Sequence, residues 1–434
     1  MCKVSVLIPV CNMEAYLREC LNSIVGQKLR EIEIICINDG STDGSLQILR
    51  EYQAEDHRIQ VIDKPNTGYG HSMNMGLKAA NGEYIGILES DDFAETEMFS
   101  TLYDTAARHK AEIVKSNFFC HAKSADTFME SLQGKKYNTL LDVTKENLYF
   151  ATPIWSGIYK REFLLQNDIW FNETPGASFQ DMSFGFKSLI CAQRLLGVKA
   201  AFVHYRIDNE SSSVHSKAKV FCICDEFKEI WRFINSRPEL KTKFQYRVPF
   251  EQYVRYMETF HRIDEKYQSM FLRRMSDEFS VLSQQGFLRE KYWPDKASWN
   301  HVQEIIQKPG EIYYERYVKS QNAKLYIAAL EAMFRTARRV YVYGAGKLGR
   351  KAVASLRGKG IVPAGVLVTS MENNPASVLG VEVQTADTVS PASDSILLIA
   401  IRKEDQYDVL LRLDAFAWGN IIVLDAKARE ALQI

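Results

Sequence analysis

Residues 82–92 read GEYIGILESDD, an apolar run that ends in three carboxylates within four residues. Such a run is typical of a buried strand, and ligands of open α/β sheets bind beyond the carboxyl ends of the strands. Closely spaced carboxylates suit Mg²⁺ or Mn²⁺, which commonly accompany a phosphorylated substrate. The alternative is a solvated acidic turn that caps a helix beginning near Ala94, because Asp and Ser are ordinary N-cap residues.

Short apolar runs alternate with amphipathic stretches before this motif. The predicted strands are residues 3–8, 31–37 and 59–62, and predicted helices include residues 13–25 and a stretch ending at Lys78. We expect the first strand to stop at Pro9, which lacks a backbone donor. Three strand-helix units in about 80 residues predict a parallel sheet with right-handed crossovers. Asp39, which ends the second strand, and Asp91 would then lie on the same rim.

The composition bounds the class of protein. The chain has 434 residues, which predicts two or three domains, and its 54 basic and 54 acidic side chains balance. A formal net charge of zero gives no support to a nucleic-acid partner. No apolar run approaches the roughly 20 residues that cross a bilayer, and the chain begins with a strand-like segment, which predicts a cytoplasmic protein. We expect the eight scattered cysteines to be reduced thiols.

Six short motifs follow one another in the first hundred residues. They are residues 8–12 (IPVCN), 38–43 (NDGSTD), 66–68 (NTG), 74–77 (NMGL), 82–84 (GEY) and 89–92 (ESDD). Their order resembles that of the inverting glycosyltransferases of family 2, closely over residues 3–118 and more loosely to about residue 215. The resemblance implies a GT-A fold, a nucleotide-sugar-binding α/β domain.

The resemblance also implies which residues bind the donor nucleotide. Asp39 matches the aspartate that hydrogen-bonds the base, and Pro9 and Asn12 match the loop that lines the base and ribose. Asn66 and Gly68, in the loop before the third helix, are further donor-binding candidates. A UDP-sugar is the favoured donor.

The acidic motif matches the metal site of the family. Glu89, Ser90 and Asp91 stand at the DxD position, where Asp91 would bind Mn²⁺ or Mg²⁺ and Glu89 would approach the ribose or the metal. Glu89 replaces the commoner Asp, and Met73 stands where many members have Arg. His215 is a further candidate metal ligand, because some relatives use a downstream His.

The acceptor side is predicted downstream. Residues 155–164 (WSGIYKREFL) and 178–184 (SFQDMSF) resemble the segment that carries the general base, and Asp181 fits that role, with Gln180 in place of the usual Glu. An inverting transfer needs a carboxylate to take the proton of the acceptor hydroxyl. The alternative is that Asp181 caps a helix running to about Cys191. Arg206 resembles the family's contact to the diphosphate.

From about residue 220 the pattern becomes helical, and Pro238, Pro249, Pro294 and Pro309 are expected to separate several helices. Residues 340–349 then read VYVYGAGKLG, a predicted strand followed by a GxGxxG turn and a helix. Later predicted strands are residues 364–368, 396–401 and 420–424. Gly344, Gly346 and Gly349 therefore form a candidate second nucleotide site in a Rossmann-like domain. NAD is not expected, because Thr369 and Ser370 occupy the place of the acidic ribose ligand.

The sequence thus predicts three domains: a GT-A domain at 1–219, a helical domain at 220–337 and a Rossmann-like domain at 338–434. The predicted function is metal-dependent, inverting hexosyl transfer to a glycan or lipid-linked acceptor in cell-surface polysaccharide or glycoconjugate synthesis. We expect a cytoplasmic protein and leave open peripheral contact with the inner face of the membrane and oligomer formation. Two rivals remain: an inactive nucleotide-sugar-binding module and an NAD-dependent oxidoreductase.

Overall fold

The computed structural model describes residues 2–122, 125–132, 137–146, 153–209, 219–312, 330, 333–335, 337–390, 395–402, 405–406, 409–410, 413, 418, 420–425, 428–429 and 432–434. The chain forms two compact units, Met1–Gln252 and Tyr253–Ile434, which are described separately. The division into three domains stays a prediction.

A large mixed sheet organises the first unit. Its strand order is β3 (Ile59–Lys64), β2 (Ile32–Asp39), β1 (Val4–Val10), β4 (Tyr84–Ile87), β9 (Gly157–Lys160), β6 (Ile113–Ala122), β10 (Leu195–Arg206) and β5 (Phe93–Ala94). Two short strands pair outside this path, β7 (Ala125–Met129) with β6 and β8 (Leu140–Leu141) with β10. The pairs among β1 to β4 are parallel, as the sequence predicted.

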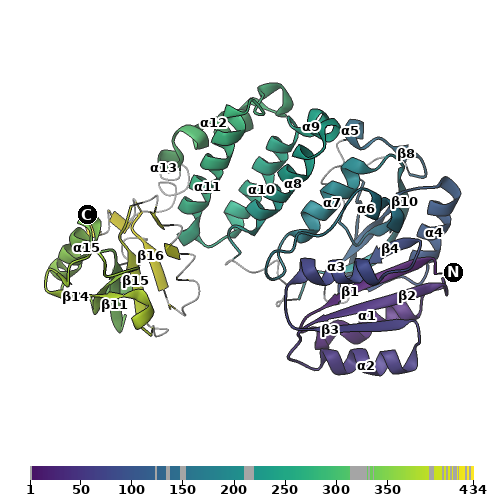
Figure 1. The fold of residues 1–434 in the computed structure, drawn as a ribbon, viewed down its shortest axis with the longest axis horizontal. Helices are drawn as coiled ribbons and strands as arrows, with labels where there is room; N and C mark the ends of the chain where they lie inside the picture. Colours follow the sequence, from purple (N-terminus) through teal and green to yellow (C-terminus); the bar gives the residue numbers. More distant parts are fainter. Residues whose placement is uncertain are drawn as a thin grey trace. The chain divides into compact units, whose positions relative to one another are not determined.

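Helices cover both faces of the parallel half of this sheet. They are α1 (Glu14–Val25), α2 (Ser45–Glu55) and α3 (Tyr69–Ala79). Figure 1 shows α2 and α3 on opposite sides of strands β1 to β3. This follows from the strand order, because right-handed crossovers place a helix on opposite faces when the chain reverses its direction across the sheet.

Two predicted boundaries are wrong. Strand β1 does not stop at Pro9 but runs to Val10, with Pro9 opposite Ile37 of β2. The pairing of β1 with β4 ends at Leu7, so the missing N–H of Pro9 costs the sheet no bond on that side. No helix begins near Ala94 either, because Phe93–Ala94 pairs with β10.

The helix after the acidic motif is α4 (Met98–His109), whose N-cap position is Glu97. None of the three acidic-motif carboxylates therefore caps a helix. The next helices are α5 (Val143–Glu146), α6 (Arg161–Gln166) and α7 (Gln180–Cys191). Phe179 is the N-cap residue of α7, and Asp181 lies in the first turn of this helix, which runs to Cys191.

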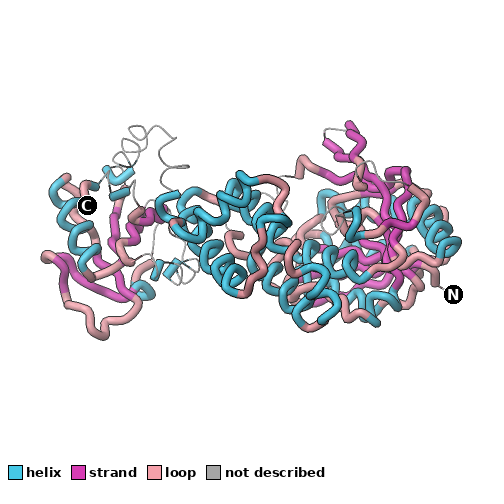
Figure 2. The backbone as a smooth tube through the Cα atoms, turned by 90° about the horizontal axis from the view of Figure 1, so that it is seen from above, coloured by secondary structure: helices cyan, strands magenta, loops and turns pink. Residues whose placement is uncertain are grey.

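The chain then becomes helical, as predicted (Figure 2). The helices are α8 (Cys222–Asn235), α9 (Pro238–Phe244), α10 (Val248–Arg262), α11 (Glu265–Gln284), α12 (Lys296–Gln307) and α13 (Pro309–Ile312), with a 3₁₀ turn at Glu290–Tyr292. Pro238, Pro249 and Pro309 each lie in the first turn of a helix, where a missing N–H is tolerated. None of the helices in the described parts of the chain is long and apolar enough to span a bilayer.

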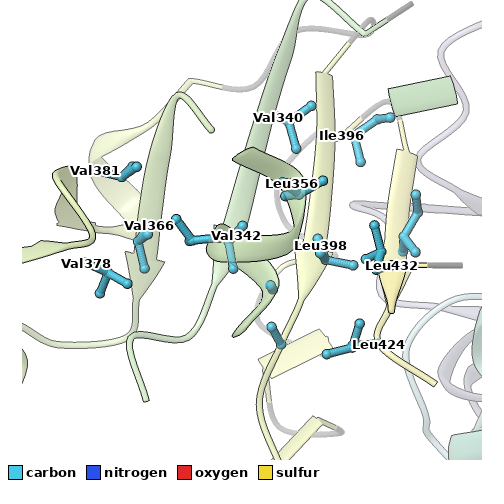
Figure 3. Close-up of a cluster of buried hydrophobic side chains, with 14 of the residues drawn as sticks. Val340, Val342, Leu356, Val366, Val378, Val381, Ile396, Leu398, Leu424 and Leu432 are labelled. Carbon is cyan, nitrogen blue, oxygen red and sulfur yellow. The ribbon is translucent and has the colours of Figure 1, made fainter. Parts of the chain in front are cut away.

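A second sheet forms near the C-terminus. Its order is β13 (Ser377–Val378), β14 (Val381–Thr385), β12 (Gly365–Val368), β11 (Arg339–Tyr343), β15 (Ser395–Ile399) and β16 (Asn420–Val423). Every pair except β13 with β14 is parallel. Helix α15 (Lys347–Gly358) packs Leu356 against Val342 and Leu398 in the core of this sheet (Figure 3).

The glycine turn between β11 and α15 contains two kinds of glycine. A Cβ on Gly349 would lie 1.7 Å from the carbonyl oxygen of Gly344, so the helix can approach the strand only without a side chain there. Gly344 itself has φ +116°. A Cβ on Gly346 would meet no atom within 4 Å among the described residues. The fold therefore requires the first and third glycines, while the second borders open space.

Replacing Gly349 by Ala should destabilise the C-terminal sheet by about 1–3 kcal/mol or more, because the added methyl group collides with backbone. Gly346→Ala is the matched control in the same turn and should change stability by less than about 0.5 kcal/mol. Urea unfolding followed by circular dichroism measures both. Equal stability of the two variants would contradict this description of the turn.

Candidate active site

The acidic motif turns sharply after β4. The backbone N–H of Asp92 donates to the carbonyl of Glu89 (3.1 Å), which closes the turn. Asp92 is buried, and its Oδ1 accepts a hydrogen bond from the Arg206 N–H (2.8 Å). Its Oδ2 is buried without a hydrogen-bond partner in the described part of the chain. Burial, and next the charge of Asp91, raise the pKa of Asp92 well above its usual range.

Asp91 is held from the end of β10. Its Oδ2 accepts a hydrogen bond from Asn209 Nδ2 (2.7 Å), and its carbonyl accepts one from Arg206 Nε (2.9 Å). The Arg206 guanidinium also contacts Glu19 (2.5 Å) and lies 4.9 Å from the ring centroid of Tyr16. The position of Arg206 beside the acidic motif agrees with a contact to the donor, and its role stays a prediction.

Glu89 connects the acidic motif to the acceptor side. The Tyr69 hydroxyl donates a hydrogen bond to Glu89 Oε1 (2.7 Å). Burial raises the pKa of Glu89 to about 8, and the negative charges of Asp91 and Asp181 add to the rise. Asp181, although far from Glu89 in the sequence, is thus one of the charges that raise the pKa of Glu89.

The loop before Asp181 is fixed by Gln180. Its Oε1 accepts from the Ser178 N–H (2.5 Å), and its Nε2 donates to Thr174 Oγ1 (2.9 Å) and the Gly176 carbonyl (3.2 Å). Gln180 is 1% exposed, so these groups have no water to replace a lost bond. The amide in place of the commoner Glu supplies donors that this loop needs.

The same segment is clamped to α3. Asn74 Nδ2 donates to the Phe171 carbonyl and to Glu173 Oε1 (both 2.9 Å), and its Oδ1 accepts from the Phe171 N–H (2.8 Å). A Cβ on Gly70 would lie 1.9 Å from the carbonyl oxygen of Asn172, so the two backbones are in direct contact. These contacts bring the chain before α7 to the helix that carries Tyr69.

Asp39 holds the loop predicted to bind the base. Both oxygens of this buried carboxylate accept backbone N–H groups, Oδ1 from Thr67 (2.8 Å) and Oδ2 from Gly68 (3.0 Å), and Lys64 forms an ion pair with it. Asn66 lies in the same loop, and its Nδ2 is 3.5 Å from the Cys11 sulfur.

Asn12 links the first two strand-helix loops. It has φ +56°, its N–H donates to Ser41 Oγ (3.0 Å), and its Oδ1 accepts from the Thr42 N–H (2.7 Å). An open groove of about 690 Å³ begins here and reaches Asn209. Its lining residues are Asn12, Glu14, Ala15, Tyr16, Asp43, Asp208 and Asn209. The groove therefore joins the predicted base-binding loops to the residue that holds Asp91.

The carboxylates fit a hard divalent cation. Glu89 and Asp91 provide oxygen ligands, and a cation would offset both the burial of Glu89 and the nearby charge of Asp91, which raise its pKa. The buried Oδ2 of Asp92, which has no hydrogen-bond partner among the described residues, lies in the same turn. His215, the other candidate ligand, lies outside the described residues.

Sequence reasoning did not assign a site role to Tyr69, Asn74 or Asn209. Asn74 belonged to a quoted motif, and Tyr69 follows another directly, so their position in the motifs was a usable signal. Nothing in the local pattern around Asn209 marks it, because it reaches Asp91 only through the pairing of β10. Met73 is 0% exposed, so this position packs in the core.

Replacing Gln180 by Glu should destabilise the first unit by about 1–3 kcal/mol, because a buried carboxylate would face carbonyl oxygens that now accept hydrogen bonds. Gln60→Glu, on the exposed face of β3, is the matched control and should be nearly neutral. Thermal unfolding compares the two. If Gln180→Glu unfolds at the same temperature as the wild type, the amide of Gln180 does not fix this loop.

Comparison with known proteins identifies the first unit. The family model described as glycosyl transferase family 2 matches residues 5–166. Glycosyltransferase GlyA of Streptococcus pneumoniae is 32% identical over 224 residues, which cover 49% of this chain and 31% of the relative. The uncharacterized glycosyltransferase EpsJ of Bacillus subtilis is 30% identical over 209 residues, which cover 47% and 60%. The chain thus spans about a third to three-fifths of these relatives.

Solved structures show the same fold. The crystal structure of S. aureus TarS 1-349 in complex with UDP-GlcNAc superposes with a TM-score of 0.59 at 21% identity, over 74% of this chain and 92% of that one. The same fragment without that ligand gives a TM-score of 0.56 at 19% identity, over 74% and 92%. Residues 5–166 of this chain therefore match glycosyl transferase family 2, and its first unit has the GT-A fold.

Proposed function

We propose that this chain transfers a sugar from a nucleoside diphosphate sugar to a hydroxyl acceptor, with inversion and with the help of Mn²⁺ or Mg²⁺. One observation carries the proposal. The charges of Asp181, on the acceptor side, and Asp91, on the donor side, add to burial in raising the pKa of Glu89, which supports one shared site for donor and acceptor. The match to the family model supports the same reaction class.

Asp181 is proposed as the general base. In an inverting transfer the acceptor oxygen attacks the anomeric carbon opposite the leaving diphosphate, and its proton passes to a carboxylate within hydrogen-bond reach. Asp181 lies in the first turn of α7, and Gln180 and Asn74 fix the chain before it. Gln180 and Asn74 would thus keep the base in position without themselves touching the reacting atoms.

The donor side is proposed to hold the nucleoside diphosphate. Asp91 and Glu89 would bind the divalent cation, which neutralises charge on the leaving diphosphate. Asp39, with Pro9, Asn12, Asn66 and Gly68, would bind the base and ribose. Ser90 and Arg206 would contact the donor near the acidic motif.

The relatives guide the choice of donor and acceptor. A UDP-sugar is proposed because TarS 1-349 is described in complex with UDP-GlcNAc and with UDP. The acceptor is proposed to be a hydroxyl of a glycan or lipid-linked saccharide in the synthesis of a cell-surface polymer. A matched protein of Bacillus spizizenii, 29% identical over 220 residues, is named poly(ribitol-phosphate) beta-glucosyltransferase. The C-terminal sheet, with Gly344, Gly346 and Gly349, is proposed as a separate regulatory or oligomer-forming domain.

Asp181→Asn should lower the rate of transfer by about 10²–10⁴-fold, because the amide cannot take the acceptor proton. It should leave the affinity for UDP in the presence of Mn²⁺ unchanged, since the donor site keeps its ligands. The measurements are UDP release with acceptor present and UDP binding by calorimetry. Asp104→Asn, an exposed change on α4, is the matched control. Unchanged turnover of Asp181→Asn would contradict the assignment of the base.

Asp91→Asn should weaken UDP binding in the presence of Mn²⁺ and abolish transfer, because the cation loses its principal carboxylate ligand. Removing divalent ions from the wild type with EDTA should have the same effect, and added Mn²⁺ should restore both properties. Calorimetric titration with UDP measures the change. Equal UDP affinity with Mn²⁺ and with EDTA would show that Asp91 holds no catalytic cation.

A further inference from the structure

A second group of metal-ligating side chains lies outside the acidic motif. His121, Asp126 and His204 each offer one ligand atom, and these atoms lie within 4.8 Å of one another. Asp126 Oδ1 is 2.9 Å from His121 Nδ1 and 3.0 Å from His204 Nδ1. Two imidazole nitrogens therefore converge on one carboxylate oxygen.

Three neighbouring strands hold these side chains. His121 of β6 stands opposite Asp126 of β7, and His204 lies on β10, the other neighbour of β6. The ring of His204 stacks between Phe93 (4.3 Å between centroids) and Phe119 (4.9 Å). Strand pairing and ring stacking therefore hold these three side chains in place.

A neutral His204 ring cannot donate to both of its carboxylate neighbours. Its Nε2 lies 3.1 Å from Glu95 Oε1, and its Nδ1 lies 3.0 Å from Asp126 Oδ1. A neutral imidazole carries one proton, so only one of these nitrogens can donate. His204 Nδ1 is buried and makes no hydrogen bond of good geometry in the described chain. With the proton on Nε2, a lone pair on Nδ1 faces the carboxylate of Asp126, and either a second ring proton or a metal cation between the two groups would make this contact favourable.

We propose that His121, Asp126 and His204 bind a divalent transition-metal ion of the Zn²⁺ class, at a site separate from Asp91. Two imidazoles and one carboxylate form a common ligand set for Zn²⁺, with water completing the coordination. Imidazole nitrogen favours Zn²⁺ over Mg²⁺ and Mn²⁺, the ions that suit the carboxylates of the acidic motif.

Glu95 fits the role of an outer partner. Histidines that bind metals commonly donate their second N–H to a carboxylate, which fixes the ring and the tautomer. Glu95 Oε1 lies at hydrogen-bond distance from His204 Nε2, and the Glu95 N–H donates to the Phe202 carbonyl (2.7 Å), which anchors this residue to β10. Three side chains would therefore supply ligands, and Glu95 would support one of them from outside.

The site also lies next to the acidic motif. Phe93 directly follows Asp92 and stacks on His204. A bound ion would fix the ring of His204 and join β7 to β10. The proposed role is therefore structural: the ion would stabilise β5 (Phe93–Ala94), the strand that directly follows the acidic motif.

Zn²⁺ titration of the full chain tests the proposal. The Asp91→Asn variant serves as background, so that binding at the acidic motif does not contribute, and calorimetry after EDTA treatment and dialysis gives the affinity. His121→Gln and Asp126→Asn should each weaken Zn²⁺ binding by at least about 10-fold, and Glu95→Gln by about 10–100-fold. His57→Gln, at an exposed position on the same unit, is the matched control and should bind as the background does.

Two further measurements distinguish a metal site from a hydrogen-bonded cluster. Co²⁺ in place of Zn²⁺ should give visible absorption bands that disappear in His121→Gln, and Zn²⁺ should raise the unfolding temperature of the background but not of that variant. Circular dichroism confirms that each variant is folded. If the background binds no Zn²⁺, or if His121→Gln and Asp126→Asn bind it as tightly as the background, the three residues form a hydrogen-bonded cluster and the proposal is wrong.

Discussion

The clamp between Asn74 and the backbone of Phe171 is the interaction on which the candidate site depends. The Asn74 side chain donates to the Phe171 carbonyl through Nδ2 and accepts from the Phe171 N–H through Oδ1. The two hydrogen bonds therefore fix both the position and the direction of the chain at Phe171. The contact between Gly70 and Asn172 adds a steric limit, since no side chain fits between the two backbones. Together with the hydrogen bond from the Tyr69 N–H to the Gly176 carbonyl (2.9 Å), the clamp fixes the chain before Asp181 against the parallel half of the sheet. The acceptor side of the site is thus positioned by a helix of the donor side.

The cost of this arrangement is electrostatic. Burial, and after it the charges of Asp91 and Asp181, raise the pKa of Glu89, so a negative charge on Glu89 is unfavourable in this place. Carboxylates held together against their repulsion are typical of sites that receive a cation or a proton during a reaction. The Tyr69 hydroxyl bond to Glu89 and the Asn209 bond to Asp91 offset part of the repulsion. Folding energy from the surrounding sheet and clamp maintains a site that would be unfavourable by itself.

Local sequence patterns predicted the parallel sheet because each strand is an apolar run followed by a helix with its own polar face. They failed where tertiary pairing decides. Pro9 continues a strand because β4 has already ended, and Phe93–Ala94 is a strand only because β10 lies beside it. The acidic motif was found from its composition, but its link to Asn209 depends on a distant strand end. Gln180 stands in place of the usual Glu, and only its contacts in the structure show that its amide holds the loop.

The remaining rival is a domain that binds a nucleotide sugar without transferring it. The most direct measurement is to incubate the full chain with a panel of UDP-sugars and Mn²⁺ and to follow UDP release and the anomer of the released sugar by NMR. The account predicts slow, Mn²⁺-dependent release of UDP from one donor, with the first sugar product inverted at its anomeric carbon. A donor that raises the unfolding temperature but releases no UDP, with or without a hydroxyl acceptor, would contradict it.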